Sequence, residues 1–345
     1  MRPALCAPTL PAIPSLLVAV LLLLVLGGCG AGSEENTVRV YSGRHYDLEQ
    51  AFQDFAEQTG VSVEFLNGGD AELRERIKAE GEDTPADVYL TVDAGNLWQA
   101  DQEGLLAPLD SAELRNAVPE GLRDPQGRWY GLSMRARTVM YNPQRVDPKE
   151  FSTTDTYAGL ADPKWRGRLC MRNSTNTYTQ SLVASLIEDY GADRARDIVR
   201  GWVDNDVQLT NSDVRILENV DAGACDVAIT NHYYLARLLK DKPGISVRPF
   251  WANQDGRGVH VNISGAGVLA NADHPQLARR LIEWLATTGQ NSFVDGNHEF
   301  PVNPKVEPEP LIKGFGRFTY QPINAEAYGA RNAQAVRLMN EVGYR

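Results

Sequence analysis

The chain alternates between strand-like and helix-like stretches once an apolar N-terminal segment has ended. Strand-like sequences stand at 37–46 (TVRVYSGRHY), 61–68 (VSVEFLNG) and 86–93 (ADVYLTVD), and helix-like sequences stand at 47–60, 70–85 and 94–104. A helix between two strands lets both strands run in the same direction, so this order predicts a parallel sheet with helices on its faces. The region therefore predicts an α/β fold.

The pattern changes at 128–142 (RWYGLSMRARTVMYN), where two strand-like runs follow one another without a helix. A second alternating unit then runs from 167–173 (GRLCMRN) to 225–230 (CDVAIT), and 258–270 (GVHVNISGAGVLA) gives two more strand-like runs. Two α/β units joined by extended segments predict two lobes that close by a hinge motion. The ligand would lie in the cleft between them, at the carboxyl ends of the strands.

We expect the chain to cross between the two lobes more than once. The predicted N-lobe comprises 38–136 plus 262–312, and the predicted C-lobe comprises 137–261 plus 313–345. A length of 345 residues agrees with this division, because domains average roughly 150 residues.

The N-terminal segment has the pattern of a secretory signal. The apolar run Leu16–Gly30 follows an early charge at Arg2, and small residues lead to Cys29 in the sequence LGGC. This is typical of a bacterial lipoprotein, so we predict a signal peptide at 1–28, an anchor linker at 29–37 and a lipid on Cys29. A transmembrane helix, the alternative, needs a longer apolar run. The mature protein would then lie in the periplasm or on the outer face of the cytoplasmic membrane, held by its lipid.

Two further cysteines, Cys170 and Cys225, remain in the predicted mature chain. A pair in an exported protein suggests a disulfide, and two buried free thiols are the alternative. Their spacing has none of the character of a metal site.

Composition and motifs restrict the class of function. The net charge of −11 argues against nucleic acid as a partner. The sequence lacks a convincing Ser-His-Asp or G-x-S-x-G nucleophile pattern. We therefore expect a binding protein and not an enzyme.

Tyrosines follow three of the predicted strands. Tyr46 comes after the first strand beside His45, and Tyr178 follows the first strand of the second unit. Tyr233 and Tyr234 follow the apolar run CDVAI in the sequence TNHYYLARL. Each tyrosine alone would more often be a packing residue. Because the carboxyl ends of the strands face the cleft, the four together predict a ligand site.

Three kinds of ligand suit clustered phenols. Aromatic walls stack on a sugar, an aromatic cage holds a polyamine or quaternary cation, and phenolate oxygens bind a hard trivalent ion such as Fe³⁺. A free phenol has a pKa near ~10, and a bound metal ion lowers such values sharply. Sugar sites tend to offer tryptophan, whereas most tryptophans here lie within or beside predicted helices: Trp98, Trp165, Trp202 and Trp284.

Five motifs carry a resemblance to a known family. They are VYSGRHYD, PADVYLTVDAGNLWQA, GLSMRARTVMYN, LADPKWRGRLCMRNSTNTYTQSL and CDVAITNHYYLARL. Over nearly all of its predicted mature part, the chain resembles the ferric iron-binding periplasmic proteins of bacterial ABC importers, in their multi-tyrosine branch. The resemblance implies a type II periplasmic binding protein, in which extended hinge segments join two α/β domains around a ligand cleft. It also implies Fe³⁺ as the transported ligand and an ABC permease as partner, and we expect a monomer.

The resemblance extends to the metal ligands. Tyr46, Tyr178, Tyr233 and Tyr234 match the family's ligand tyrosines, and His45 matches a position that is a ligand in only some members. A binding protein for a sugar or polyamine, with the same tyrosines as aromatic walls, is the alternative.

One departure from the family pattern bears on the choice of ligands. Carboxylate-using relatives place a glutamate where this chain has Val92. Asp93 comes one residue later, where a strand turns its side chain to the other face, so we predict that it caps the following helix. A site of four tyrosines is therefore favoured over one that uses a glutamate.

Four phenolates around Fe³⁺ would leave a net charge of −1, which burial makes costly unless a cation lies close. Arg44, Arg137 and Arg237 lie in suitable segments. The alternative for each arginine is a surface salt bridge. We predict Arg137 as the residue that offsets this charge or anchors an accompanying anion.

Overall fold

The structure, a computed structural model, describes residues 36–44, 48–322 and 324–345. The predicted signal peptide and Cys29 lie outside the described residues, as do His45 and Tyr46. In the part of the chain that is described, no helix has the length and apolar character needed to cross a membrane.

The described strands form one mixed sheet of ten strands. Their bounds are β1 Thr37–Ser42, β2 Ser62–Asn67, β3 Val88–Thr91, β4 Tyr130–Tyr141, β5 Leu169–Arg172, β6 Gln208–Thr210, β7 Val227–Asn231, β8 Arg248–Phe250, β9 His260–Val268 and β10 Phe300–Pro301. The α-helices are α1 Leu48–Thr59, α2 Asp70–Glu80, α3 Ala94–Gln102, α4 Ala112–Ala117, α5 Thr156–Gly159, α6 Thr177–Tyr190, α7 Ala192–Asp204, α8 Asp213–Asp221, α9 His232–Asp241, α10 Pro275–Ala286, α11 Gln290–Val294, α12 Pro310–Lys313 and α13 Glu326–Glu341.

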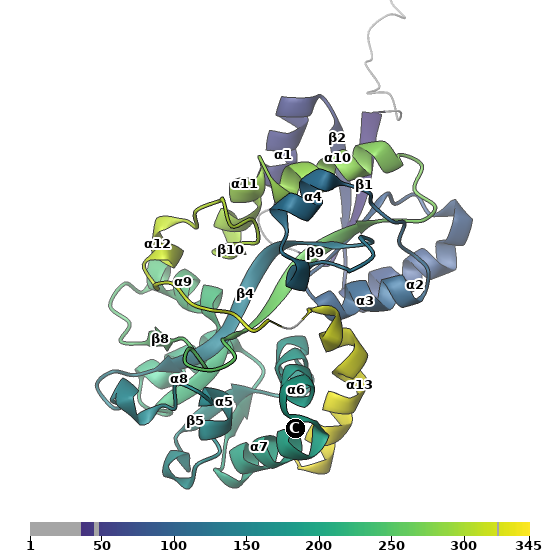
Figure 1. Ribbon diagram of the computed structural model, residues 1–345. Coiled ribbons are helices and arrows are strands. Elements are labelled where there is room, and N and C mark those ends of the chain that lie inside the picture. Colours follow the sequence, from purple (N-terminus) through teal and green to yellow (C-terminus); the bar gives the residue numbers. More distant parts are fainter. Residues whose placement is uncertain (1–35, 45–47, 323) are drawn as a thin grey trace, which may run out of the picture. The chain divides into compact units, whose positions relative to one another are not determined.

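Two parallel units flank a central antiparallel pair of strands (Figure 1). The strand order is β2-β1-β3-β9-β4-β7-β5-β6, and β8 and β10 also pair with β4. β1 is parallel to both β2 and β3, and β5 is parallel to both β6 and β7. The parallel sheet predicted for the first unit is therefore confirmed. β4 and β9, which pair with each other, join the two parallel units.

Local signals in the sequence account for the helix ends in the second unit. Asn176 precedes α6, and its side chain accepts a hydrogen bond from the backbone N–H of Thr179. α6 ends at Tyr190, and the C-cap residue Gly191 has a φ of 78°, which favours glycine. The N-cap fixes where α6 begins, and with it the place of Tyr178, its second residue, in the first turn.

The segment at 128–142 differs from its prediction. In place of two successive runs it holds the single twelve-residue strand β4, and 258–270 likewise holds the single strand β9. The predicted lobe boundaries at 136/137 and 261/262 fall inside these strands, where Ala136 pairs with Val261 and Arg137 pairs with His260. The two predicted boundaries therefore lie opposite each other in the pairing of β4 with β9, and the lobe division stays a prediction.

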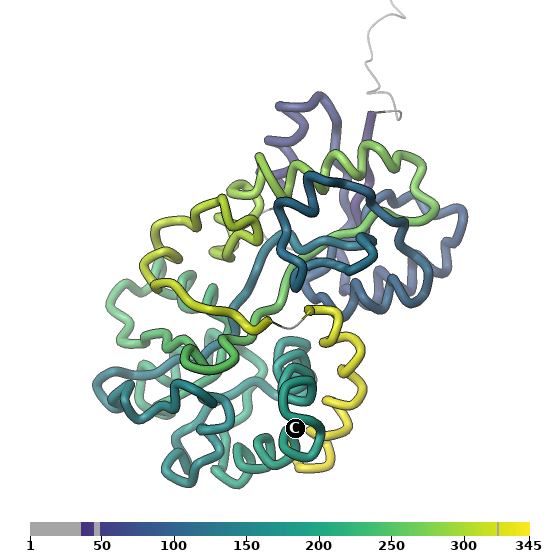
Figure 2. The backbone as a smooth tube through the Cα atoms, in the orientation of Figure 1, coloured from purple at the N-terminus to yellow at the C-terminus, as the bar shows by residue number. Residues whose placement is uncertain are grey.

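The C-terminal helix α13 packs against α6 and also against α3 (Figure 2). Arg331 pairs with Glu188 of α6 at 2.8 Å. Against α3, the contact involves Gly329 of α13 and Gly95 of α3. A Cβ added to Gly329 would lie only 3.0 Å from the carbonyl oxygen of Gly95 and 2.7 Å from Cε3 of Trp98. The absence of a side chain at Gly329 therefore allows α13 to approach α3.

We expect Gly329→Val to lower the free energy of unfolding by about 1–3 kcal/mol, because overpacking displaces well-packed neighbours. Thermal and urea unfolding measure the effect. Ala330→Val is the matched control, since Ala330 is the next residue of the same helix and is exposed. Equal destabilisation of the two variants would show that the α3–α13 contact has no special need for glycine.

Cys170 and Cys225 form a disulfide. Cys170 lies in β5 and Cys225 precedes β7, the strand that leads to Tyr233. The disulfide and the pairing of β5 with β7 therefore hold together the strands that lead to α6 and α9.

Candidate metal centre

A cavity of about 570 Å³ lies where segments from both parallel units meet. Its wall includes residues of α2, α3, α6, α9 and α13, and residues that follow β1 and precede β10. Three of the predicted ligand tyrosines, Tyr178, Tyr233 and Tyr234, line it together.

The three tyrosines stand in the first turns of two helices. Tyr178 is the second residue of α6, and Tyr233 and Tyr234 are the second and third residues of α9. The Oη of Tyr233 lies 3.4 Å from that of Tyr178, and the rings of Tyr233 and Tyr234 have centroids 4.2 Å apart. A helix N-terminus carries partial positive charge, so both helix ends favour the anionic form of these phenols.

The helix α9 was not predicted from the sequence, which indicated a loop after the strand. The chain passes from β7 directly into α9 at Asn231, because Leu235, Ala236 and Leu238 supply a buried helical face. Asn231 stands at the cap position, but its side chain accepts a hydrogen bond from Arg137. The backbone N–H groups of the first turn of α9 therefore donate no capping hydrogen bond to this side chain.

Burial favours the protonated form of two of these phenols, Tyr233 and Tyr234. It raises the pKa of Tyr233 well above its ordinary value, and Tyr178 and Tyr234 act in the same direction. Burial also raises the pKa of Tyr234, to about 12. A ligand that takes these oxygens as phenolates must therefore displace protons at neutral pH.

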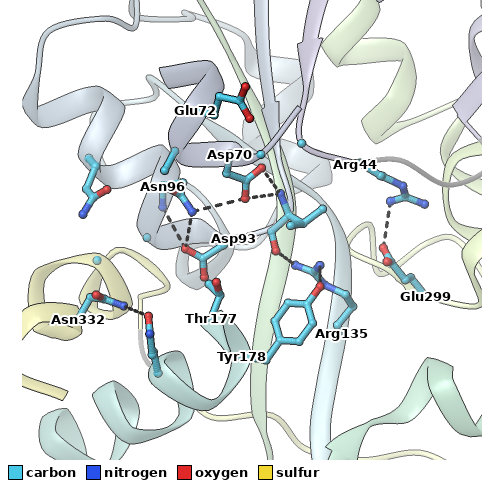
Figure 3. Close-up of a pocket in the computed structure, with 18 of the residues that line it drawn as sticks. Arg44, Asp70, Glu72, Asp93, Asn96, Arg135, Thr177, Tyr178, Glu299 and Asn332 are labelled. Carbon is cyan, nitrogen blue, oxygen red and sulfur yellow. Dashed lines mark hydrogen bonds and ion pairs between the residues drawn. The ribbon is translucent and has the colours of Figure 1, made fainter. Parts of the chain in front are cut away.

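The structure places Arg135 beside the phenols, a position that was not predicted from the sequence. It is 2% exposed, its Nη1 lies 3.5 Å from the Oη of Tyr178, and its Cζ lies 5.3 Å from the Tyr178 ring centre (Figure 3). A second hydrogen bond to the carbonyl oxygen of Val92 fixes the guanidinium at the cavity wall. Arg237 adds positive charge, with its Cζ 5.2 Å from the centre of the Tyr233 ring.

Arg137 has other partners. Its Nη1 lies 3.3 Å from a carboxylate oxygen of Asp213, and it also donates to Asn231 and Thr179. Arg172 binds the second oxygen of the same carboxylate at 2.7 Å. Arg135 and Arg137 are two residues apart in one strand, so their side chains leave the same face. Both arginines therefore lie on the same face of β4, and the role predicted for Arg137 stays a prediction.

The opposite wall contains Val92, Asp70 and Asp93. Asp93 is the N-cap of α3, where it accepts from the backbone N–H of Asn96 at 3.0 Å and from Asn262 at 2.8 Å, so the predicted cap is confirmed. Burial raises the pKa of Asp70 to about 7, and Asp93 adds to the effect. Among the described residues, no three His, Cys, Asp or Glu side chains are grouped to hold a metal ion.

His45 and Tyr46 lie outside the described residues, but Arg44 directly before them is described and buried. Its Nη1 lies 3.0 Å from a carboxylate oxygen of Glu299, and both residues line the cavity (Figure 3). No pattern in the sequence pointed to Glu299.

The chain is similar to known solute-binding proteins. The family model for bacterial extracellular solute-binding proteins matches residues 83–314. Iron uptake protein A1 of Synechocystis is 39% identical over 321 residues, which is 90% of this chain and 88% of that protein. The Fe(3+)-binding periplasmic protein of Serratia marcescens is 28% identical over 86% of this chain and 89% of its own length.

Solved structures agree with the fold. The Trichodesmium protein IdiA (FutA), solved in complex with iron and citrate ligands, superimposes with a TM-score of 0.85 and 42% identity, over 90% of this chain and 100% of that one. The ferric binding protein of Campylobacter jejuni gives a TM-score of 0.81 and 31% identity, over 89% and 100%. The expected type II periplasmic-binding-protein fold is therefore confirmed. The chain belongs to the bacterial extracellular solute-binding protein family, whose members bind solutes for transport and are not enzymes.

Proposed function

We propose that this protein captures Fe³⁺ outside the cytoplasm and delivers it to an ABC permease. Tyr46, Tyr178, Tyr233 and Tyr234 supply phenolates, and His45 is a further candidate donor. The observation that carries the proposal is the meeting of Tyr178, Tyr233 and Tyr234 in one cavity at two helix N-termini. Relatives that carry iron in their names, and one solved with iron bound, support the same ligand.

The charges at the cavity suit phenolates around a trivalent ion. Four phenolates and Fe³⁺ sum to −1, and a buried net charge needs a compensating partner. Arg135 stands against Tyr178, Arg237 stands over Tyr233, and both helix ends add positive potential. These arginines would repel a polyamine cation, and a neutral sugar has no negative charge for them to offset, so the same observation favours an anionic ligand set around a metal ion.

The lobe division supports a capture step and a closing step. Tyr46 follows β1 in the predicted N-lobe, whereas Tyr178, Tyr233 and Tyr234 belong to the predicted C-lobe. Iron bound first by the C-lobe tyrosines would gain its remaining ligands when the lobes rotate about the β4–β9 crossing. The closed protein, a monomer tethered through a lipid on Cys29, would then dock on the permease.

A titration of the purified mature protein with ferric citrate, followed by visible absorption, tests this function. Phenolate ligation predicts a broad charge-transfer band that saturates at one iron per chain. A protein that stays colourless at every iron concentration would refute the iron proposal, and sugars and organic cations would then be tested in the same cavity.

Arg135 and Arg137 give the proposal a discriminating pair of variants. We expect Arg135→Gln to weaken iron binding by about 10- to 100-fold, as losses of outer partners of metal ligands do. Arg137→Gln should instead lower stability, because it removes one partner of the buried carboxylate of Asp213. Competition against a ferric chelator and thermal unfolding measure the two effects. The reverse pattern would restore Arg137 as the charge-offsetting residue.

A further inference from the structure

A buried carboxylate, Glu299, lies at the cavity wall but is fully occupied by protein partners. The residue is 1% exposed and lines the same cavity as the tyrosines. One oxygen accepts hydrogen bonds from Arg44 at 3.0 Å and from Ser133, and the other accepts from Asn297. With both oxygens engaged by donors, Glu299 is suited to hold other groups in place and not to bind iron itself.

On one side, Glu299 holds the segment that leads to His45 and Tyr46. Arg44 directly precedes that pair and is 1% exposed. Its Nη1 binds Glu299, its Nη2 donates to the carbonyl oxygen of Phe293 at 2.6 Å, and its Cζ lies 4.0 Å from the Phe293 ring centre. The last described residue before the predicted ligands is thus fixed in position.

On the other side, the next residue in sequence contacts the segment that leads to Tyr233. The ring of Phe300 lies 4.5 Å, centre to centre, from the ring of His232, and His232 lies 6.0 Å from the ring of Tyr233 in an edge contact. His232 is itself held, because its Nδ1 accepts from the backbone N–H of Ala136 at 3.2 Å. Two consecutive residues, Glu299 and Phe300, therefore touch both ligand-bearing segments.

We propose that Glu299, with Phe300, is a positioning residue for the iron-binding phenols, and that it sets the placement of Arg44 relative to the start of α9. The inference rests on the proposed iron-binding function. Its physical basis is preorganisation: ligands held by a buried network of hydrogen bonds lose less freedom when the metal binds. The charge of Glu299 persists in this site, because Arg44 and Arg135 outweigh the effect of burial and hold its pKa below the ordinary value.

The test removes both charges of the buried pair at once. Glu299→Gln alone would leave Arg44 buried without its counter-ion, so the variant to make is Arg44→Gln/Glu299→Gln. We expect it to fold and to bind iron about 10- to 100-fold more weakly, with a charge-transfer band of altered energy, because the phenolates meet the metal in a changed geometry. The control is Asp101→Asn/Arg128→Gln, which removes a 2.8 Å ion pair outside the cavity lining.

A second variant, Phe300→Leu, keeps the test decisive if the double variant fails to fold. It removes the ring that contacts His232 and leaves the Arg44–Glu299 pair intact, and we expect weaker iron binding with a shifted band. Wild-type affinity and an unchanged band in a folded variant would overturn the inference, as would an equal change in the control. A wild-type protein that shows no iron band would refute the proposed function itself, and the inference with it.

Discussion

Tyr233→Phe is expected to weaken ferric iron binding by more than about 100-fold while the protein stays folded. Changes to the outer partners of metal ligands cause losses of up to about 100-fold, and the loss of a ligand should exceed them. Phenylalanine keeps the ring that packs on Tyr234 and His232 and removes only the oxygen. The lost oxygen lies 3.4 Å from that of Tyr178, so the variant loses a candidate ligand at the centre of the phenol cluster. Competition against a ferric chelator gives the affinity, and the charge-transfer band should lose intensity.

Tyr130→Phe is the matched control for this variant. Tyr130 is also a buried tyrosine, and its hydroxyl donates to the carbonyl oxygen of Leu109 outside the cavity lining. Its loss should lower the free energy of unfolding by about 1 kcal/mol, as the removal of one hydrogen bond does, without an effect on iron. If Tyr233→Phe bound iron as tightly as the wild type, Tyr233 could not be a ligand.

The sequence predicted those parts of the fold that depend on local pattern. The alternation from β1 to α3 and the Asp93 cap were predictable, because each depends on residues within a few positions of one another. The continuity of β4 was not, because it depends on pairing with β9, a strand far along the chain, and the register of that pairing shifts between Gly131 and Ser133. Tertiary pairing decides such cases.

The candidate site shows the same division between local and distant signals. Tyr178, Tyr233 and Tyr234 could be selected because each follows a recognisable strand, and the structure brings them together. Glu299 could not be selected, because its partner Arg44 lies 255 positions away. The start of α9 was not predicted, although Asn231, a residue type that often caps helices, stands directly before it.

Iron affinity should fall steeply as the solution becomes more acidic. In the iron-free protein, burial raises the pKa of Tyr234 to about 12. Burial also raises the pKa of Tyr233 well above the ordinary value of a tyrosine. Binding as phenolates therefore releases protons throughout the range from mildly acidic to mildly alkaline pH. Each released proton changes the apparent affinity about tenfold per pH unit, so the four proposed phenolates give about ten-thousandfold per pH unit.

The slope of the logarithm of iron affinity against pH gives the number of protons released on binding, and therefore the number of phenolate ligands. The variants then test which tyrosines release those protons. Affinity is measured at several pH values by competition with a chelator whose own proton binding is known. Tyr233→Phe should lower the slope by one proton, because one phenol fewer must be deprotonated, whereas Tyr130→Phe should leave it unchanged. A wild-type slope near zero would mean that iron binds without displacing phenol protons, and phenolate ligation would then be excluded whatever the absolute affinity.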